Sequence, residues 1–401
     1  MIPSHFERLD ALLVQHRPWW QFRPFHCRDY PWAVPSLTAW LEQLQDDELW
    51  ALDADPVALA EALSPWVDSR RVQDLIAQYR GTDSAAACPD ERLGQGVPGR
   101  KWSQIHAFAD SIGGNPGAVL EWCAGKGHLG RLLASRGAVS VCSLEWQSQL
   151  CEQGARSAQA AGVAQHFRRA DVMRLTPEVF AGADTAVALH ACGDLHRQLL
   201  TLWAQRPTPS LALAPCCYHL QADDRYTPLS QRGRSSALVL QRGDLSQALQ
   251  ETVTTGARGV RLRNRELHWR MAFDEVQRSL RQCDEYLPLP TIPKLLLSGS
   301  FVDFVQWALA RKQLAFSCAL DLPAFDAQGA ERARRVRRME LVAKLFRRPL
   351  ELWLVLDRAC YLLEAGAQVS VTAFCHYGLT PRNLLIQAQT QRSELTVNGD
   401  V

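Results

Sequence analysis

The chain has 401 residues, of which 47% are hydrophobic, and its formal net charge at pH 7 is +2. This hydrophobic fraction supports a large buried core and excludes disorder over most of the chain. The nearly neutral charge excludes a general electrostatic attraction to nucleic acids or anionic membranes, so a partner of that kind requires a local basic patch.

The N-terminus lacks the continuous apolar core of a signal peptide, and no stretch approaches the ~18–20 uninterrupted apolar residues of a membrane span. We therefore expect a cytoplasmic protein that has no membrane partner and whose 12 cysteines are reduced. The sequence does not predict an oligomeric state.

Residues 1–95 are expected to form a helical N-terminal region. Phe6, Leu9, Leu12 and Leu13 are spaced to lie on one face of a helix. The region also contains six tryptophans: Trp19, Trp20, Trp32, Trp40, Trp50 and Trp66. Tryptophans either pack in a helical core or form a platform on which substrate bases stack. The helical periodicity favours the core.

Residues 96–244 alternate short β-rich runs with helical stretches. The β-rich runs are 118–121, 139–144, 167–172, 185–189 and 211–214, and the clearest helices are 128–135 and 147–161. This rhythm predicts an α/β fold, with a Rossmann-like parallel sheet and helices on both of its faces. Such sheets bind ligands beyond the carboxyl ends of their strands, so we expect the functional site there.

Residues 245–345 are mostly helical and charged, and we interpret them as a helical insertion. In residues 346–392, a helix at 350–364 precedes two further strands at 369–374 and 383–388. These strands are expected to complete the same sheet. Residues 393–401 have the character of a frayed tail.

A glycine-rich turn follows the first predicted strand. Gly125, Gly127 and Gly130 have the G-x-G-x-x-G spacing, which lets the backbone approach a ligand at the start of a helix. Glu121 ends the strand, where the cationic methionyl group of S-adenosylmethionine needs a counter-charge. Residues 122–124 then separate this acid from the first glycine, whereas dinucleotide-binding enzymes usually place that glycine close to the strand. This arrangement favours S-adenosylmethionine.

Two further acids stand near the ends of the next two strands. Glu145 ends the second strand 20 residues after Gly125 and can accept hydrogen bonds from both ribose hydroxyls. Asp171 ends the third run, where a polar side chain would meet the adenine amine. A nicotinamide cofactor, or a glycine turn that binds no ligand, remains an alternative.

The fourth and fifth strands end in the sequences HACGDL (190–195) and PCCYH (215–219). Small, soft side chains there would line a tight cofactor pocket. Alternatively they handle the substrate, with His190, Asp194 or His219 as general base and Tyr218 stacking on the target. The third possibility is a metal site drawn from His190, Cys192, Cys216, Cys217 and His219. Zinc usually takes spaced cysteine pairs, and adjacent cysteines do not easily both chelate, so we expect no metal.

Together, EWCAGKGHLG (121–130), HACGDL, PCCYH and TPRN (380–383) resemble a group of class I S-adenosylmethionine-dependent methyltransferases. The group includes the tRNA acceptor-stem 2′-O-methyltransferases, several methyltransferase-like proteins and a glutathione-transferase C-terminal-domain-containing protein. The resemblance covers 101–240 and 350–389. It implies a transferase with a Rossmann-like methyltransferase domain, and it places 190–194 beside the reaction centre. The expected cofactor-binding residues are Lys101, Glu121, Cys123, Ala124, Gly125, Lys126, Gly127, Glu145, Trp146, Asp171, Val172 and His190.

Basic residues gather in two runs, 258–270 and 331–348. Such runs can neutralise phosphates, or they can form an ordinary solvated helix face. Together with the resemblance, they make RNA the leading substrate and RNA modification the expected role; the expected substrate-binding residues are Arg334, Arg335, Arg337 and Arg338. Methylation of proteins or small molecules, an NAD(P)-binding oxidoreductase and a non-catalytic role remain alternatives.

Overall fold

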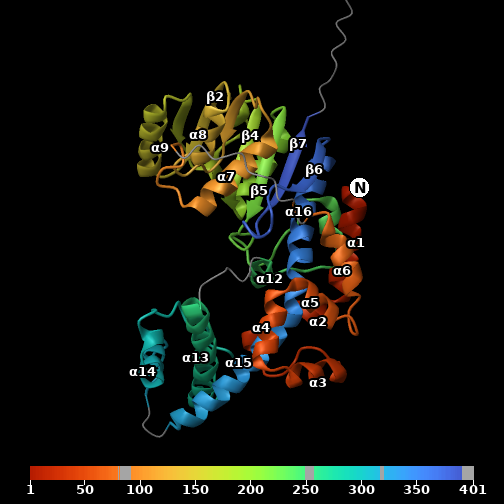
Figure 1. The fold of residues 1–401 in the computed structure, drawn as a ribbon, viewed down its shortest axis with the longest axis vertical. Helices are drawn as coiled ribbons and strands as arrows, with labels where there is room; N and C mark the ends of the chain where they lie inside the picture. The colour runs from red at the N-terminus through yellow and green to blue at the C-terminus, as the bar shows by residue number, and fades with distance from the viewer. Residues whose placement is uncertain (80, 82–91, 249–256, 317–319, 391–401) are drawn as a thin grey trace, which may run out of the picture. The chain divides into compact units, whose positions relative to one another are not determined.

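The computed structural model describes residues 1–79, 81, 92–248, 257–316 and 320–390. The chain forms two compact units (Figure 1). Unit 1 comprises residues 1–15, 73–250 and 348–401, and unit 2 comprises residues 16–72 and 251–347. The predicted N-terminal region is therefore divided between the two units.

Unit 1 contains a seven-stranded sheet in the order β3-β2-β1-β4-β5-β7-β6 (Figure 1). Its strands are β1 (Ala118–Glu121), β2 (Ser140–Glu145), β3 (Gln165–Arg169), β4 (Thr185–Cys192), β5 (Ser210–Cys216), β6 (Gln368–Ala373) and β7 (Leu384–Gln389). The first five strands are parallel to their neighbours, while β7 is antiparallel to both β5 and β6. The Rossmann-like fold is confirmed, and the two late strands join the same sheet as expected.

The strand order reverses between β1 and β4, since β2 and β3 lie on one side of β1 and β4 and β5 on the other. Ligands of doubly wound sheets bind at such a reversal, beyond the carboxyl ends of the strands. Buried strands of parallel sheets have continuous apolar runs rather than alternating ones. The run 186–188 of β4 is such a run, because it reads Ala-Val-Ala and all three residues are buried.

Helices cover both faces of the sheet. The helices of unit 1 include α1 (Ile2–Gln15), α7 (Gly99–Ile112), α8 (His128–Ser135), α9 (Ser148–Ala161), α10 (Asp194–Gln205), α11 (Gln231–Arg234), α12 (Arg242–Gln247) and α16 (Arg347–Glu364, from Arg348 on). Phe108 of α7 and Leu132 of α8 pack with Val141 and Val187 of the sheet in one apolar cluster. In α1, Phe6 lies 5.2 Å from Trp353 of α16 between ring centroids.

Unit 2 is helical. Its elements include α2 (Arg17–Trp20), η1 (Pro24–His26), α3 (Pro35–Gln43), α4 (Asp46–Ala54), α5 (Pro56–Ala62), α13 (Ala257–Arg281), η4 (Leu296–Ser298), α14 (Phe301–Arg311) and α15 (Leu322–Lys344), while α6 (Ser69–Ala77) runs from unit 2 into unit 1. Gly329 lets α15 approach α13 closely, since a Cβ there would lie 2.4 Å from the Ala272 side chain. None of the six N-terminal tryptophans is exposed, which agrees with core packing.

Three strand ends differ from expectation. β3 ends at Arg169, and the 3₁₀ helix η2 (Val172–Arg174) follows at once. The reason is local: the Asp171 carboxylate accepts a hydrogen bond from the Met173 N–H and caps that turn. β4 and β5 extend further than expected, through Cys192 and Cys216.

Among the described residues, no helix combines the length and apolar character needed to cross a bilayer.

Candidate active site

The turn between β1 and α8 is built on left-handed backbone. Cys123, Gly125 and Gly127 have φ angles of 56°, 59° and 62°. The Ala124 N–H donates to the Leu144 carbonyl across 2.9 Å, which ties the turn to β2. At Gly125 a Cβ would meet no atom within 4 Å, so this position opens onto free space beside the turn. A ligand can therefore approach the backbone closely here.

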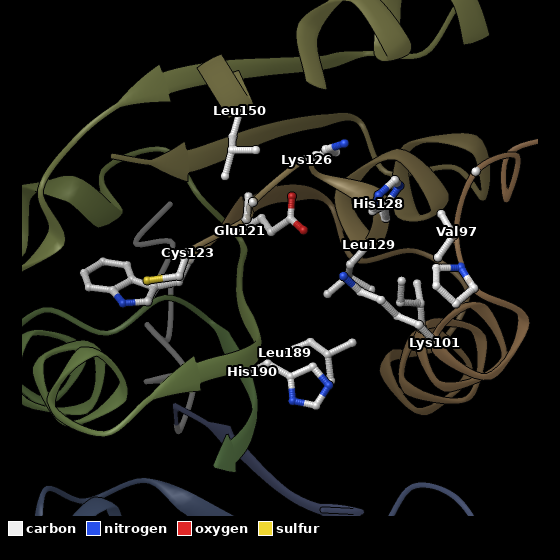
Figure 2. Close-up of a pocket in the computed structure, with 16 residues that line it drawn as sticks. Val97, Lys101, Glu121, Cys123, Lys126, His128, Leu129, Leu150, Leu189 and His190 are labelled. Carbon is white, nitrogen blue, oxygen red and sulfur yellow. The ribbon is translucent and has the colours of Figure 1, made fainter. Parts of the chain in front are cut away.

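A cavity of about 430 Å³ adjoins this turn, which is within the size range of small-molecule sites. Its walls come from the start of α7, the end of β1, the glycine turn and the end of β4. Figure 2 shows Lys101, Glu121 and His190, from three different segments, around the same space. The cavity brings together seven expected cofactor residues: Lys101, Glu121, Cys123, Ala124, Gly125, Lys126 and His190.

Sequence reasoning missed other parts of the wall. Residues 96–98 line the cavity just before α7, and Ile105, His128, Leu129 and Leu150 line it from α7, α8 and α9. Except for His128, these side chains are apolar or lack polar atoms, as expected for the wall of a small-molecule site. His128 follows Gly127 directly as the first residue of α8, so it stands at the helix N-terminus beside the glycine turn.

Glu121 is fully buried at the wall of the cavity. Its carboxylate accepts a hydrogen bond of 2.6 Å from the Ser143 hydroxyl. Burial raises the pKa of Glu121 to about 7, against the opposing effects of the Ser143 hydroxyl, the Gly130 N–H and the Arg131 charge. A cation placed in the cavity would favour the ionised form. Glu121 is thus an acid whose charge depends on occupancy of the site.

Glu145 holds the glycine turn from the end of β2. One of its carboxylate oxygens accepts from the Gly125 N–H and the other from the Gln147 N–H, each across 3.0 Å. Each oxygen retains a second lone pair for a hydroxyl donor. The contact to ribose hydroxyls remains a prediction.

The other expected cofactor residues lie outside the cavity wall. Gly127 caps α8, and a Cβ there would lie 2.4 Å from the Phe167 ring. Trp146 is 65% exposed and Val172 is buried. Asp171 is exposed two residues beyond β3. Whether any of them contacts the adenosine stays a prediction.

His190 lies at the wall of the cavity with a left-handed φ of 68°. Burial lowers its pKa to about 4, and the charges of Lys101 and Arg382 act in the same direction. The imidazole is therefore neutral at physiological pH. A neutral imidazole can accept a hydrogen bond or a proton from a substrate group.

Tyr218 is buried and does not line the cavity, and its expected stacking role stays a prediction. Its side chain is 1% exposed, and its hydroxyl donates to the Pro215 carbonyl, at 3.4 Å. The Arg358 guanidinium lies 4.9 Å from the centre of its ring, and His196 packs against it edge-on. The Tyr218 ring is therefore part of the buried core of unit 1.

Asp194 and His219 stand beside that segment. The Asp194 carboxylate accepts from the Ala222 N–H across 2.7 Å, and this bond ties the loop after β5 to the start of α10. His219 is half-buried, and its Nδ1 is buried with no hydrogen-bond partner among the described residues. Neither residue lines the cavity. A role as general base stays a prediction for both.

The expected arginine surface of α15 is only partly a surface. Arg338 is buried, and its guanidinium donates to the Glu42 carboxylate across 2.6 Å. Arg335 donates to the Arg28 carbonyl across 2.7 Å. Arg337 is half-buried with Asp46 at 3.8 Å, whereas Arg334 is exposed. The Glu42 carboxylate thus pairs with a buried Arg338, so the basic surface expected on α15 is only partly exposed. Substrate binding by the four arginines stays a prediction.

Residues 100–223 match a family model described as a methyltransferase domain. The match includes the glycine turn, the strands β1 to β5 and the 190–219 segment. This part of the chain is a methyltransferase domain. Its cofactor is S-adenosylmethionine. The match to a methyltransferase model decides against the alternative of a nicotinamide cofactor.

Several solved structures are similar to part of this chain. The Pyrococcus abyssi tRNA (uracil-54, C5)-methyltransferase in complex with S-adenosyl-L-homocysteine is 19% identical over 28% of this chain and 27% of that chain, with a TM-score of 0.24. An RNA methyltransferase from Salinibacter ruber in complex with the same compound is 13% identical, over 33% and 85% of the two chains, with a TM-score of 0.26. A geranyl diphosphate methyltransferase in complex with S-adenosylmethionine is 15% identical, over 34% and 60%, with a TM-score of 0.25. Because these TM-scores are low, the assignment rests on the family match and the site geometry.

The residues of the methyltransferase domain fit this cofactor. The turn at Gly125 opens onto free space, as close approach of a ligand requires. Glu121 supplies a carboxylate at the wall for the cationic methionyl end, and Glu145 supplies acceptors beyond β2. The cavity volume and a wall that combines apolar side chains with charged and polar ones suit a ligand with an aromatic base and polar groups.

Proposed function

We propose that this protein transfers methyl groups from S-adenosylmethionine to RNA, as a member of the group that includes the tRNA acceptor-stem 2′-O-methyltransferases. The observation that carries the transferase part is the cavity between the glycine turn, Glu121 and His190. The cofactor supplies an electrophilic methyl group on a sulfonium. The protein then has to hold the acceptor in line with that methyl group and exclude water.

In this proposal, Glu121 binds the cationic methionyl end and Glu145 binds the ribose hydroxyls. His190 is the one expected catalytic residue that lines the cavity. Being neutral, it can accept the proton of a ribose hydroxyl as the methyl group arrives. A ring nitrogen with a free lone pair has no such proton, and His190 would then serve only to position the base.

The support for RNA is a second cavity, of about 470 Å³, within unit 2. Both basic runs of the sequence contribute to it: Arg265, His268 and Trp269 from α13, and Arg334 and Arg337 from α15. Two aspartates, Asp46 and Asp326, also line it; Asp46 lies 3.8 Å from Arg337, and Asp326 lies 3.1 Å from His268.

Arg265 and Arg334 are thus the cations of this cavity that have no paired aspartate among its lining residues. The Arg265 guanidinium lies 5.7 Å from the centre of the Trp269 ring, and Arg334 is exposed. Guanidinium groups beside an aromatic ring suit a phosphate with a neighbouring base. This pairing of charge and aromatic surface favours RNA over an uncharged small molecule.

The transfer is tested with methyl-tritiated S-adenosylmethionine and lysate from cells that lack the protein. The labelled product is divided between nuclease and protease treatment. We expect the label to be released by nuclease. Release by protease instead would identify a protein substrate and refute the RNA proposal, and label in neither polymer would point to a small-molecule acceptor.

Binding is tested with R334E and with R311E as the matched control. Arg311 is also an exposed arginine of unit 2, at the end of α14 and outside the cavity. We expect R334E to weaken RNA binding across sequences and to lower the slope of log K against log[salt] by about 1 or more, because one phosphate contact is lost and the new carboxylate repels the backbone. R311E should bind as the wild type does. Equal binding and equal salt slopes in both variants would remove the second cavity from the proposal.

A further inference from the structure

Three cysteine thiols meet beside the cofactor cavity. The sulfur atoms of Cys192, Cys216 and Cys217 all lie within 4.8 Å of one another. The Cys192 and Cys216 sulfurs are 3.5 Å apart. Cys216 is buried and the other two are half-buried. Cys192 follows His190 by two residues, so the cluster adjoins the wall of the cofactor cavity.

The backbone explains how adjacent cysteines can face the same point. Cys192 and Cys216 are register partners on the neighbouring parallel strands β4 and β5. Along a regular strand, Cys216 and Cys217 would point to opposite faces of the sheet. Cys217 instead has a left-handed φ of 48°. This change of direction at the end of β5 turns its side chain back toward the other two thiols.

Backbone hydrogen bonds hold the two segments that carry the thiols. The Gly193 N–H donates to the Cys216 carbonyl across 3.2 Å, and the Asp194 N–H donates to the Leu220 carbonyl across 3.0 Å. The Leu220 N–H donates in turn to the Cys217 carbonyl across 2.8 Å. A Cβ at Gly193 would lie 1.7 Å from the Leu220 carbonyl oxygen, so only glycine allows this contact. The sulfurs are therefore held by the fold before any ligand arrives.

The surroundings of the thiols contain one positive charge and two buried nitrogens without a hydrogen-bond partner among the described residues. The charge of Arg382 acts on both Cys192 and Cys217. The Nε of Arg382 is buried and has no hydrogen-bond partner among the described residues. The Nδ1 of His219, two residues after Cys217, is likewise buried without a partner. Among the described residues, two buried nitrogens near the cluster thus keep unused hydrogen-bonding capacity.

We propose that Cys192, Cys216 and Cys217 form a binding site for one thiophilic metal ion, with Zn²⁺ as the expected occupant. Zinc binds thiolate sulfur at about 2.3 Å, so two sulfurs of a tetrahedral site lie about 3.8 Å apart. The separation of 3.5 Å between Cys192 and Cys216 requires little adjustment. Each S–H bond breaks as its sulfur binds the metal, and the proton goes to solvent.

The described residues supply three ligands to this site rather than four, since no further histidine, cysteine or carboxylate joins the group. Structural zinc sites have four protein ligands, whereas sites with three leave a position for water or a substrate atom. The site is therefore of the open type, next to the cavity for the methyl donor. It is independent of whether the acceptor is RNA.

The test is zinc binding by the reduced full-length protein, with Zn²⁺ alone as the probe and metal content measured after equilibrium dialysis. We expect one Zn²⁺ per chain. The variants C192S, C216S and C217S should each lower the affinity by more than about 100-fold, because changes outside the ligand set alone cost 10- to 100-fold. C142S is the matched control, since Cys142 is a free, half-buried thiol of the same sheet, on strand β2 and outside the cluster.

Binding of S-adenosyl-L-homocysteine to each variant reports whether its methyltransferase domain is folded. If a serine variant fails to fold, Co²⁺ binding to the wild type decides instead. Strong thiolate-to-cobalt absorption with tetrahedral d–d bands is expected. Absence of a stoichiometric metal in the reduced wild type, or equal binding by C142S and by folded C192S, C216S and C217S, would overturn the proposal.

Discussion

The buried Glu121 carboxyl makes the stability of the methyltransferase domain depend on pH. Its pKa is about 7 in the folded protein, against an ordinary value of 4.5. Below pH 4.5 the carboxyl is protonated in both the folded and the unfolded chain, and it causes no penalty. Between pH 4.5 and 7 only the unfolded chain ionises, so the free energy of unfolding falls as pH rises. The loss is about 3 kcal/mol, from the difference of the two pKa values at 1.36 kcal/mol per unit.

The variant E121Q removes the ionisation and keeps the shape of the side chain. We expect the free-energy difference between wild type and E121Q to change by about 3 kcal/mol in favour of E121Q from pH 4 to pH 9. Urea denaturation of the two proteins at several pH values measures this difference. The matched control is E152Q, because Glu152 is exposed on α9; its pH dependence should follow that of the wild type.

Cofactor binding should show the opposite trend. The ionised carboxylate attracts the cationic methionyl end, so the affinity for S-adenosyl-L-homocysteine should rise as pH passes through about 7. E121Q should bind about 10- to 100-fold more weakly above that pH, the equivalent of one hydrogen bond to a charged group. A pH-independent difference in stability, or equal affinity of the two proteins at pH 8, would refute the assignment of Glu121 as a buried counter-charge.

Three further substitutions test the surroundings of the site. D357A should lower the free energy of unfolding by about 3–5 kcal/mol in urea denaturation, because the buried Asp357 carboxylate accepts from the Tyr226 hydroxyl, the Ser230 hydroxyl and two backbone N–H groups. The control D224A, at a side chain that is 90% exposed, should change this free energy by less than about 0.5 kcal/mol. Similar losses in both variants would contradict the prediction. Y218F should leave kcat in the tritium assay unchanged. A tenfold fall in kcat would show that the Tyr218 hydroxyl takes part in the reaction. In H190N, asparagine accommodates the left-handed backbone of position 190. Since the pKa of His190 is about 4, the pH–rate profiles of the wild type and H190N should be parallel between pH 6 and 8. An inflection in the wild type alone would show that His190 titrates in this range.

The methyltransferase domain was largely predictable from the sequence because its signals are local. The periodicity of residues 118–216 defines strands and helices, and the spacing of Glu121, Gly125 and Glu145 follows from one strand, one turn and the next strand. The return of β6 and β7 to the sheet was also predictable, since two β-rich runs after a long helix need a partner. The end of β3 was not, because the capping bond of the Asp171 side chain competes with the strand pattern.

What the tertiary structure alone decided is where polar and reactive side chains point. The sequence PCCYH left a chemical role open for Tyr218, yet Tyr218 is buried against Arg358, which lies 140 positions further along the chain. The arginines of α15 form one charged run in the sequence, but one of them, Arg338, is buried and donates to the Glu42 carboxylate. The three thiols converge only because of a left-handed residue and a register between two strands. Sequence therefore determined the frame of the site through short-range pattern, whereas burial and pairing depend on residues distant in the chain, and these only the folded structure brings together.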